Sequence, residues 1–255
     1  MRNIWTICRK ELGSYFVSPI AYLLLTVSAV VSGFFFWVIL RGFVAEGLEM
    51  TMRGENFPMN INEQIVRPIL MNVAVIFLFF LPLITMRLFA EEKRTGTIEL
   101  LATSPVHDIE IILGKWLAAL MLYAAMLLMP ALNFIFLFIY GNPDWKPLAV
   151  GYLGLLLLGG VFLAIGTFIS TLTRNQIIAA AVTFAVCLLL WVLEWSTSFG
   201  SGKVSTVLSY FSVIAHFDSF AKGVIDLKDV IFYLSGIFLG LFATARSLES
   251  LRWRS

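Results

Sequence analysis

Six long apolar runs place the strongest limit on what this chain can fold into. A helix needs about 20 consecutive apolar residues to cross the hydrocarbon core of a bilayer. None of the six runs contains Asp, Glu, Lys, Arg or His, and the last is short enough that its helix could begin earlier, within Leu227–Asp229. We therefore predict an all-α integral membrane protein with six transmembrane helices, at about 19–40, 68–86, 116–140, 148–173, 175–193 and 230–245.

The composition agrees with a membrane protein. Of the 255 residues, 60% are hydrophobic and only 13% are charged, whereas soluble domains carry about 25% charged residues. The net charge of +2 gives no reason to expect a nucleic-acid partner. The cysteines, Cys8 and Cys187, lie far apart in the sequence, so neither a disulfide framework nor a metal site is expected.

The distribution of Lys and Arg indicates how the chain crosses the membrane. Loops on the cytoplasmic side of a membrane protein carry an excess of these residues. With the N-terminus inside, the inner segments are 1–18, 87–115, the turn at Arg174 and 246–255, and they hold more Lys and Arg than 41–67, 141–147 and 194–229. We therefore expect both termini, and residues 87–115, to face the cytoplasm.

Residues 1–18 are predicted to form an amphipathic helix that lies in the membrane interface. At 100° per residue one arc is basic and polar, and Glu11 is the one charged residue that falls with the apolar side. The helix could simply anchor the first span, or act as a lever joined to it. The apolar arc holds Ile4, Trp5, Ile7, Cys8, Leu12, Tyr15 and Phe16.

The charged stretch 87–115, RLFAEEKRTGTIELLATSPVHDIEIILGK, separates two apolar runs. We expect the second span to continue into water until Gly96 breaks it, because glycine readily ends helices. A short amphipathic turn follows over 96–101, and Ser104-Pro105 is a start signal for the next helix. A solvated loop would not need Ile98, Leu100 and Leu101, so the pattern favours a surface that docks on a soluble partner.

Two other segments have notable patterns. The run 148–173 has small residues four apart at Gly160/Ala164 and Gly166/Ser170, which allows close helix approach, either within the chain or between copies. The segment 194–229 is too long for a simple turn and too apolar for a disordered one, so we expect a re-entrant helix on the outer face. Its candidate site residues are Glu194, His216, Phe217 and Asp218, and Glu194 either marks the interface or lines a substrate path.

Several function classes are disfavoured. Ion-coupled carriers need ionisable side chains within their spans, and the six runs have none. Neither histidine lies in a span with a Ser or Cys partner, so a membrane hydrolase or metalloenzyme is poorly supported. Gly-Ser-Gly-Lys at 200–203 lacks the glycine at 197 and the Ser or Thr at 204 that a phosphate loop requires. We expect no catalytic, cofactor or metal residues, and no ATP hydrolysis by this chain.

Three stretches resemble a known family. They are AEEKRTGTIELLATSP (90–105) followed by EIILGKWLA, STLTRNQIIAAAVTF (170–184) and AHFDSFAKGVIDLKDVIFY (215–233), and RKELGSYFVSPIAY (9–22) is less specific. Together they resemble permease subunits of ABC-2 type transporters, in the gliding-motility GldF-like and NosY-like branch. The resemblance covers nearly the whole chain and implies one ABC-2 (type V exporter-like) transmembrane domain over 1–255.

The resemblance also implies partners. In that family two six-span permeases pair about a two-fold axis, and each docks a cytoplasmic coupling helix into a groove of a separate ATPase. It therefore implies two ABC ATPase subunits, which carry ATP and Mg, and a second permease copy, either identical or related. A GldG-like membrane or periplasmic auxiliary protein and membrane lipid complete the expected partners, in the bacterial inner membrane.

The coupling residues carry over position by position. The ATPase-coupling interface would hold Glu91, Glu92, Lys93, Arg94, Gly96, Thr97, Ile98, Glu99, Leu100 and Leu101, with a second cytoplasmic turn at Thr173, Arg174, Asn175 and Gln176. Two functions stay open: a transport permease, and a scaffold or force-transmitting subunit driven by an ATPase. A continuous cavity between subunits would favour the first, and a closed dimer interface the second.

Overall fold

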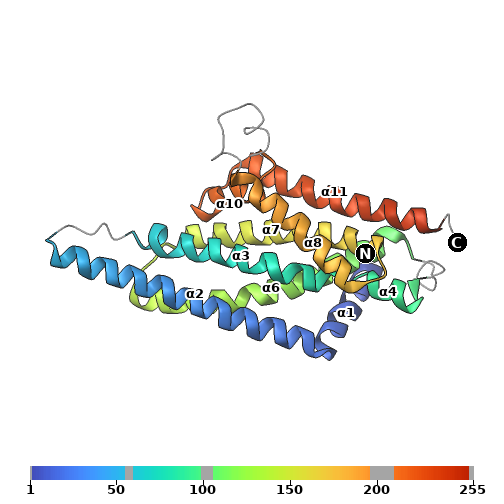
Figure 1. Cartoon of the computed structure of the whole chain (residues 1–255), viewed down its shortest axis with the longest axis horizontal. Coiled ribbons are helices and arrows are strands. Elements are labelled where there is room, and N and C mark those ends of the chain that lie inside the picture. The colour runs from blue at the N-terminus through green and yellow to red at the C-terminus, as the bar shows by residue number, and fades with distance from the viewer. Residues whose placement is uncertain (1, 55–59, 99–105, 196–209, 253–255) are drawn as a thin grey trace.

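The computed structural model describes residues 2–54, 60–98, 106–195 and 210–252, and in these residues the regular structure is entirely helical. Six helices of the described chain are long and apolar enough to cross a membrane, which confirms the predicted fold class (Figure 1). Their main α-helical parts are α2 (Pro19–Met52), α3 (Arg67–Thr85), α6 (Asp108–Tyr140), α7 (Trp145–Leu172), α8 (Gln176–Val192) and α11 (Leu227–Arg252).

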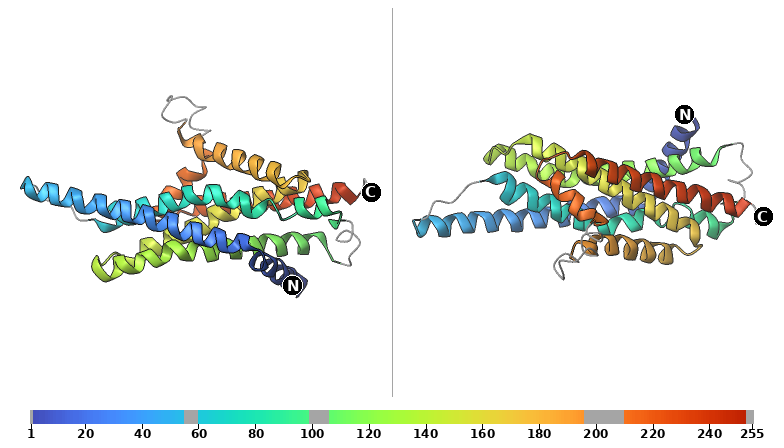
Figure 2. Two further views of the ribbon diagram at one scale, coloured as in Figure 1. Left: turned by 60° about the horizontal axis from the view of Figure 1, so that its bottom comes forward. Right: turned by 90° about the horizontal axis from the view of Figure 1, so that it is seen from above.

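Shorter helices lie at the two ends of this bundle. At one end lie α1 (Arg2–Val17), α4 (Ala90–Thr95) and both ends of the chain (Figure 1). The π-helical turn η1 (Asn62–Val66) precedes α3, and α10 (Val213–Ala221) lies where α11 begins, away from the C-terminal end. Figure 2 shows α1 set at an angle to the long helices rather than parallel to them.

The core of the bundle is built around α3 and α7. The apolar stretch of the α3 segment is 61% buried and that of α7 is 56% buried, against 17% in α2, α8 and α11. α7 packs against α3, α6, α8, α10 and α11. The three outer helices therefore keep most of their apolar surface for lipid or for another subunit.

Small residues let α7 approach its neighbours closely. A Cβ added to Gly159 would lie 2.1 Å from Cε1 of Tyr123, and one added to Gly166 would lie 2.2 Å from Oγ1 of Thr85. Ala164 is equally close to Gly240 of α11, because a Cβ added to Gly240 would lie 2.8 Å from the Cβ of Ala164. These contacts assign the small residues of 148–173 to packing within the chain.

Helix boundaries differ from the apolar runs at several places. α2 continues to Met52, although 41–67 reads as a loop, and Gly54 (φ 73°) follows its end. No proline interrupts 41–52, so a helix that is already nucleated propagates through the charged residues. α6 begins at Asp108, eight residues before the apolar run, and α11 begins at Leu227, as the short sixth run allowed.

Candidate functional site

Helix α4 is held at its start by the end of α7. The backbone N–H groups of Phe89 and Ala90 both donate to Oγ of Ser170, each at 3.0 Å. At the other end Gly96 has φ 75°, the left-handed conformation that favours glycine and ends helices. The predicted break at Gly96 is therefore where α4 stops, and no local pattern signals the contribution of Ser170. The second span does not continue unbroken to Gly96, because α3 ends at Thr85 and a turn at 86–89 separates it from α4.

The charged side chains of α4 point in different directions. Glu91 accepts a hydrogen bond from Nε of Arg87 at 3.0 Å, and Lys93 donates to the backbone carbonyl of Thr171. Glu92 points inward and is only 16% exposed, with Oε1 at 2.7 Å from Nζ of Lys115. Both carboxylates that α4 contributes to the predicted docking surface, Glu91 and Glu92, are therefore engaged within the chain.

An exposed strip remains at the end of α4. Its members are Arg94, Thr95, Gly96 and Thr97, and Ile98 is half-buried against the core cluster. The predicted coupling residues Glu99, Leu100 and Leu101, and the start signal at Ser104-Pro105, lie outside the described residues. The role of this whole set as an ATPase interface stays a prediction.

Lys115 forms the centre of a buried charge cluster. Its Nζ lies 2.9 Å from Oε1 of Glu11 on α1 and 2.7 Å from Oε1 of Glu92, and its side chain is 2% exposed. The face of Phe89 lies below the ammonium group, 5.3 Å away. Glu11 thus falls on the buried side of α1 because it pairs with Lys115.

Glu11 and Lys115 are each a charged residue on an otherwise apolar helix face, a pattern that is visible in the sequence. Lys115 follows Ile111 and Ile112 and precedes Ala118 and Ala119, all of them buried, at the spacing of one helix face. A charge at such a position must find a partner, because an unpaired charge is costly to bury. Sequence reasoning missed Lys115 because it counted the residue as part of the solvated stretch.

Helix α1 packs on α6 as an amphipathic helix. Cys8 is buried, and the hydroxyl of Tyr15 donates to the carbonyl of Ile84 at 3.1 Å. A Cβ on Gly114 would lie 2.8 Å from Cβ of Ile7, so the two helices are in close contact. Trp5, at the edge of the predicted apolar arc, is 59% exposed.

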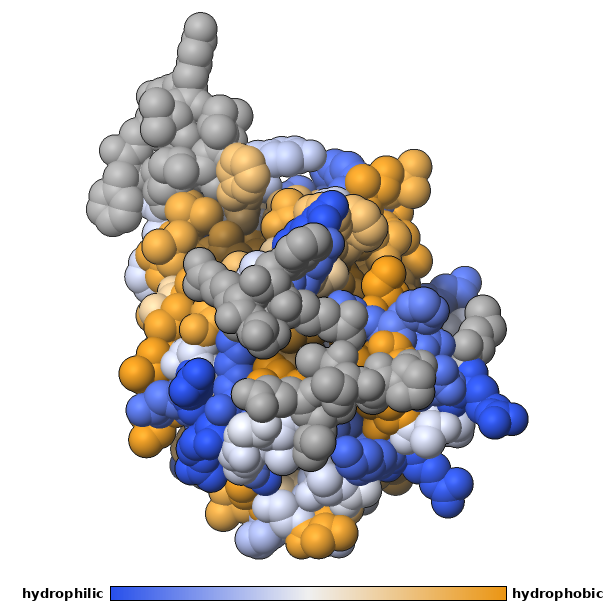
Figure 3. Space-filling model, turned by 90° about the vertical axis from the view of Figure 1, so that its right-hand side faces the viewer, coloured by the Kyte–Doolittle hydropathy of each residue, from blue (hydrophilic) through white to orange (hydrophobic). Residues whose placement is uncertain are grey.

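The turn that joins α7 to α8 lies next to α4. Asn175 caps α8, since its side chain accepts hydrogen bonds from the backbone N–H groups of Ile177 and Ile178. Oγ1 of Thr173 accepts from the N–H of Asn175, Arg174 is exposed and Gln176 is half-buried. α4 contacts both α7 and α8. Figure 3 looks onto this end of the molecule, where hydrophilic residues gather.

A second polar cluster lies at the start of α11. Nδ1 of His216 lies 2.6 Å from Oδ1 of Asp229, its Nε2 lies 3.0 Å from the carbonyl of Tyr210, and its ring stacks on Phe232. Both side chains are buried, and Phe217 is buried in the core. Asp229 was missed because it lies one residue before the apolar run 230–245.

Asp218 points to the opposite side of α10 and joins it to α3. Its carboxylate lies 2.5 Å from Nη2 of Arg67 and 2.5 Å from Nζ of Lys222. Burial would raise the pKa of Asp218, but the hydrogen bonds from Lys222 and Arg67 outweigh it and hold the pKa below its usual value. Glu194 is half-buried just beyond α8, and a substrate-path role for it stays a prediction.

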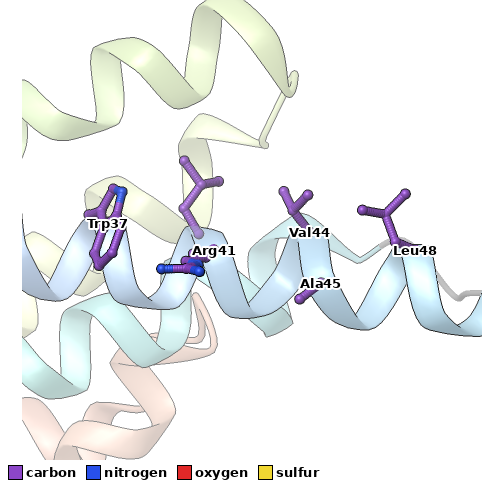
Figure 4. A pocket seen from close by; sticks show the side chains of 6 residues that line it. Trp37, Arg41, Val44, Ala45 and Leu48 are labelled. Atoms are coloured by element: carbon purple, nitrogen blue, oxygen red, sulfur yellow. The ribbon is translucent and has the colours of Figure 1, made fainter.

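A shallow hollow lies on the C-terminal half of α2. The guanidinium of Arg41 sits over the Trp37 ring, 5.3 Å from its centroid, and the hollow extends along the helix (Figure 4). The lining residues are Trp37, Leu40, Arg41, Val44, Ala45 and Leu48. A single helix supplies all of them, so the feature is an open surface rather than an enclosed binding site.

These features define a class of protein: a multi-pass helical membrane protein with a polar, partly charged platform at one end of its bundle. The platform consists of α4 and the α7–α8 turn, supported by α1 and α6. The family model of the ABC-2 family transporter proteins matches residues 5–244. The chain belongs to this family, and it is the membrane component of an ABC transporter rather than a catalytic subunit. A comparison with curated proteins found no match.

Proposed function

We propose that the chain is a permease subunit that couples ATP hydrolysis by a separate ABC ATPase to substrate export or to membrane-associated work. The observation that carries this proposal is the platform: the exposed strip at the end of α4 and the turn at 173–176 lie together, and Ser170 and Lys115 fasten α4 to the membrane helices. A force on the strip therefore reaches the spans. ATP and Mg would be held by the ATPase and not by this chain.

The complex would be a dimer of permeases with two ATPase subunits. α2 and α8 both pack on α3, and the ring centroids of Phe79 on α3 and Phe184 on α8 lie 5.0 Å apart. Both outer helices leave most of their apolar surface uncovered in the single chain. We infer that α1, α2 and α8 lie near a second permease, identical or related, on a two-fold axis.

The finer assignment follows the residues quoted above. The motifs at 90–105, 170–184 and 215–233 favour the GldF-like and NosY-like branch. That branch places the protein in a bacterial inner membrane with both termini in the cytoplasm, and it makes a GldG-like auxiliary protein a candidate partner.

A second candidate function is force transmission to a partner outside the cell membrane. The favouring observation is α2, which projects beyond the other helices at the end away from α4 (Figures 1 and 2). Its exposed residues there include Val44, Leu48 and Met52.

The test is binding to the ATPase. The full chain is purified from its own membranes, and the associated ABC ATPase is identified and titrated back in nanodiscs. Arg94→Glu, and Glu99→Arg in the predicted docking turn, should weaken binding at least tenfold, because like charges in an interface cost several kcal/mol. Glu46→Arg, exposed on the far part of α2, is the control and should bind within twofold.

Two results would contradict the proposal. One is a wild-type chain that associates with no ABC ATPase. The other is equal binding by Arg94→Glu, Glu99→Arg and Glu46→Arg, which would mean that the exposed strip at the end of α4 docks on no ATPase.

A further inference from the structure

We propose that Lys115 is a positioning residue that joins α4, α1 and the start of α6 into one moving unit. The inference rests on the proposed function, because it names how motion of the platform passes to the membrane helices. Lys115 would not touch the ATPase. It would act through Glu92 on α4 and Glu11 on α1, whose carboxylates it holds at 2.7 Å and 2.9 Å.

The charges join three helices, α1, α4 and α6, because Lys115 of α6 pairs with one carboxylate on each of the other two. Two carboxylates share one ammonium group, and each is only 16% exposed. Without Lys115 the two carboxylates would repel each other at low exposure, so α1 and α4 would separate. Without Glu92, a balanced Glu11–Lys115 pair would remain, α1 would stay on α6, and α4 would lose this attachment.

Further hydrogen bonds connect α4 to the start of the first span, α2. Arg87, which precedes α4, donates to Glu91 at 3.0 Å and, through Nη1, to Oγ of Ser18 at 3.4 Å. Ser18 is the N-cap residue between α1 and α2. Displacement of α4 is thus passed to α1 through Lys115 and to the α1–α2 corner through Arg87.

A purely structural explanation makes a different prediction. Replacing a buried ion pair or triad by apolar or neutral residues of similar size is often neutral for stability. If Lys115 only fills space, the neutral triple variant Glu11→Gln/Glu92→Gln/Lys115→Met should behave like the wild type in every assay. If Lys115 is a joint, the triple variant should keep the fold but lose the mechanical link.

The first experiment uses the full chain alone in nanodiscs. Spin labels are placed at Arg9→Cys on α1 and Arg94→Cys on α4, in a Cys8→Ser/Cys187→Ser background, and their distance distribution is measured by electron paramagnetic resonance. The wild type should give one narrow distribution. Glu92→Gln and the neutral triple variant should at least double its width. Glu46→Gln, at an exposed carboxylate on the far part of α2, is the control and should leave the width unchanged.

The second experiment adds the ATPase to unlabelled protein. Glu92 points inward, so Glu92→Gln should bind the ATPase within twofold of the wild type, while the permease-dependent part of ATPase activity falls at least fivefold. If Glu92→Gln loses binding as Arg94→Glu does, Glu92 is a docking residue and the joint is refuted. Unchanged label widths in both Glu92→Gln and the triple variant also refute it. A wild type that binds no ATPase refutes the proposed function, while the label widths still decide on the joint.

Discussion

The substitution Gly159→Ala should destabilise the bundle, because among the described glycines an added Cβ comes closest to a neighbour here. The new Cβ would lie 2.1 Å from Cε1 and 2.5 Å from Cζ of Tyr123. The Tyr123 side chain is fully buried, its ring meets Phe77 at a centroid distance of 4.9 Å, and its hydroxyl donates to the carbonyl of Leu155 at 2.7 Å. The ring therefore has no free direction in which to move.

The size of the effect follows from these contacts. Carbon atoms attract at about 3.5–4.0 Å, so the ring or the helix must shift by more than ~1 Å. Overpacking of a dense core costs ~1–3 kcal/mol, and a hydroxyl displaced from its acceptor in a buried site costs ~1–3 kcal/mol. The two costs overlap, because one shift relieves the clash and breaks the hydrogen bond. We expect a total loss of ~2–4 kcal/mol.

The assay is unfolding of the purified chain in mixed micelles with increasing SDS, followed by tryptophan fluorescence. Gly42→Ala is the control, because an added Cβ there meets nothing within 4 Å. It should be neutral or stabilise by up to ~1 kcal/mol. Tyr123→Leu in the Gly159→Ala background removes the clashing ring edge, so the double variant should lose less than the sum of the single losses. Equal midpoints for Gly159→Ala and Gly42→Ala would refute the packing argument.

Three other substitutions test local contacts. Asn175→Ala removes the cap of α8 and should cost ~0.5–2 kcal/mol, seen as faster amide exchange at 177–178; no change would refute the cap, and Gln176→Ala is its control. Ser170→Ala leaves the N–H groups of Phe89 and Ala90 without their acceptor, so exchange there should accelerate, and unchanged exchange would contradict the contact. Asp218→Asn should lower the unfolding midpoint at pH 7. Because the folded-state pKa of Asp218 lies below its unfolded value of about 3.9, the gap should close as pH falls below about 4, and a constant gap would argue against the ion pair.

The sequence predicts the six membrane helices well because each apolar run is long and uninterrupted by charge. It also predicts where α4 ends, because few residues other than glycine adopt φ 75° at a helix end. Residues 41–52 were misread because their charges suggested a loop, while the helix continues through them. Local pattern decides such an end only when a breaking residue is present.

The platform could be predicted only in part. Glu11 and Lys115 each stand out as a charge on an apolar helix face, but they are separated by more than a hundred residues and nothing local states that they meet. Glu92 was expected at the docking surface because the resemblance carries over the motif AEEKRTGTIELL position by position. Its inward direction goes with its contact to Lys115 of α6, which only the tertiary packing brings about.

Because α2 is long, a small movement at its start would displace its far end by several ångströms. At 1.5 Å per residue its 34 residues form a rod of about 51 Å, against a hydrocarbon core of about 30 Å. Ser18, at the start of this rod, accepts from Arg87, so motion of α4 acts at one end. A tilt of about 5° about Ser18 would move Met52 by roughly 4 Å, if the helix stays straight. Export would need such tilts to open a path between two permeases, whereas force transmission would need only the far end of α2 to move. The spin-label widths in Glu92→Gln test the joint that both functions require.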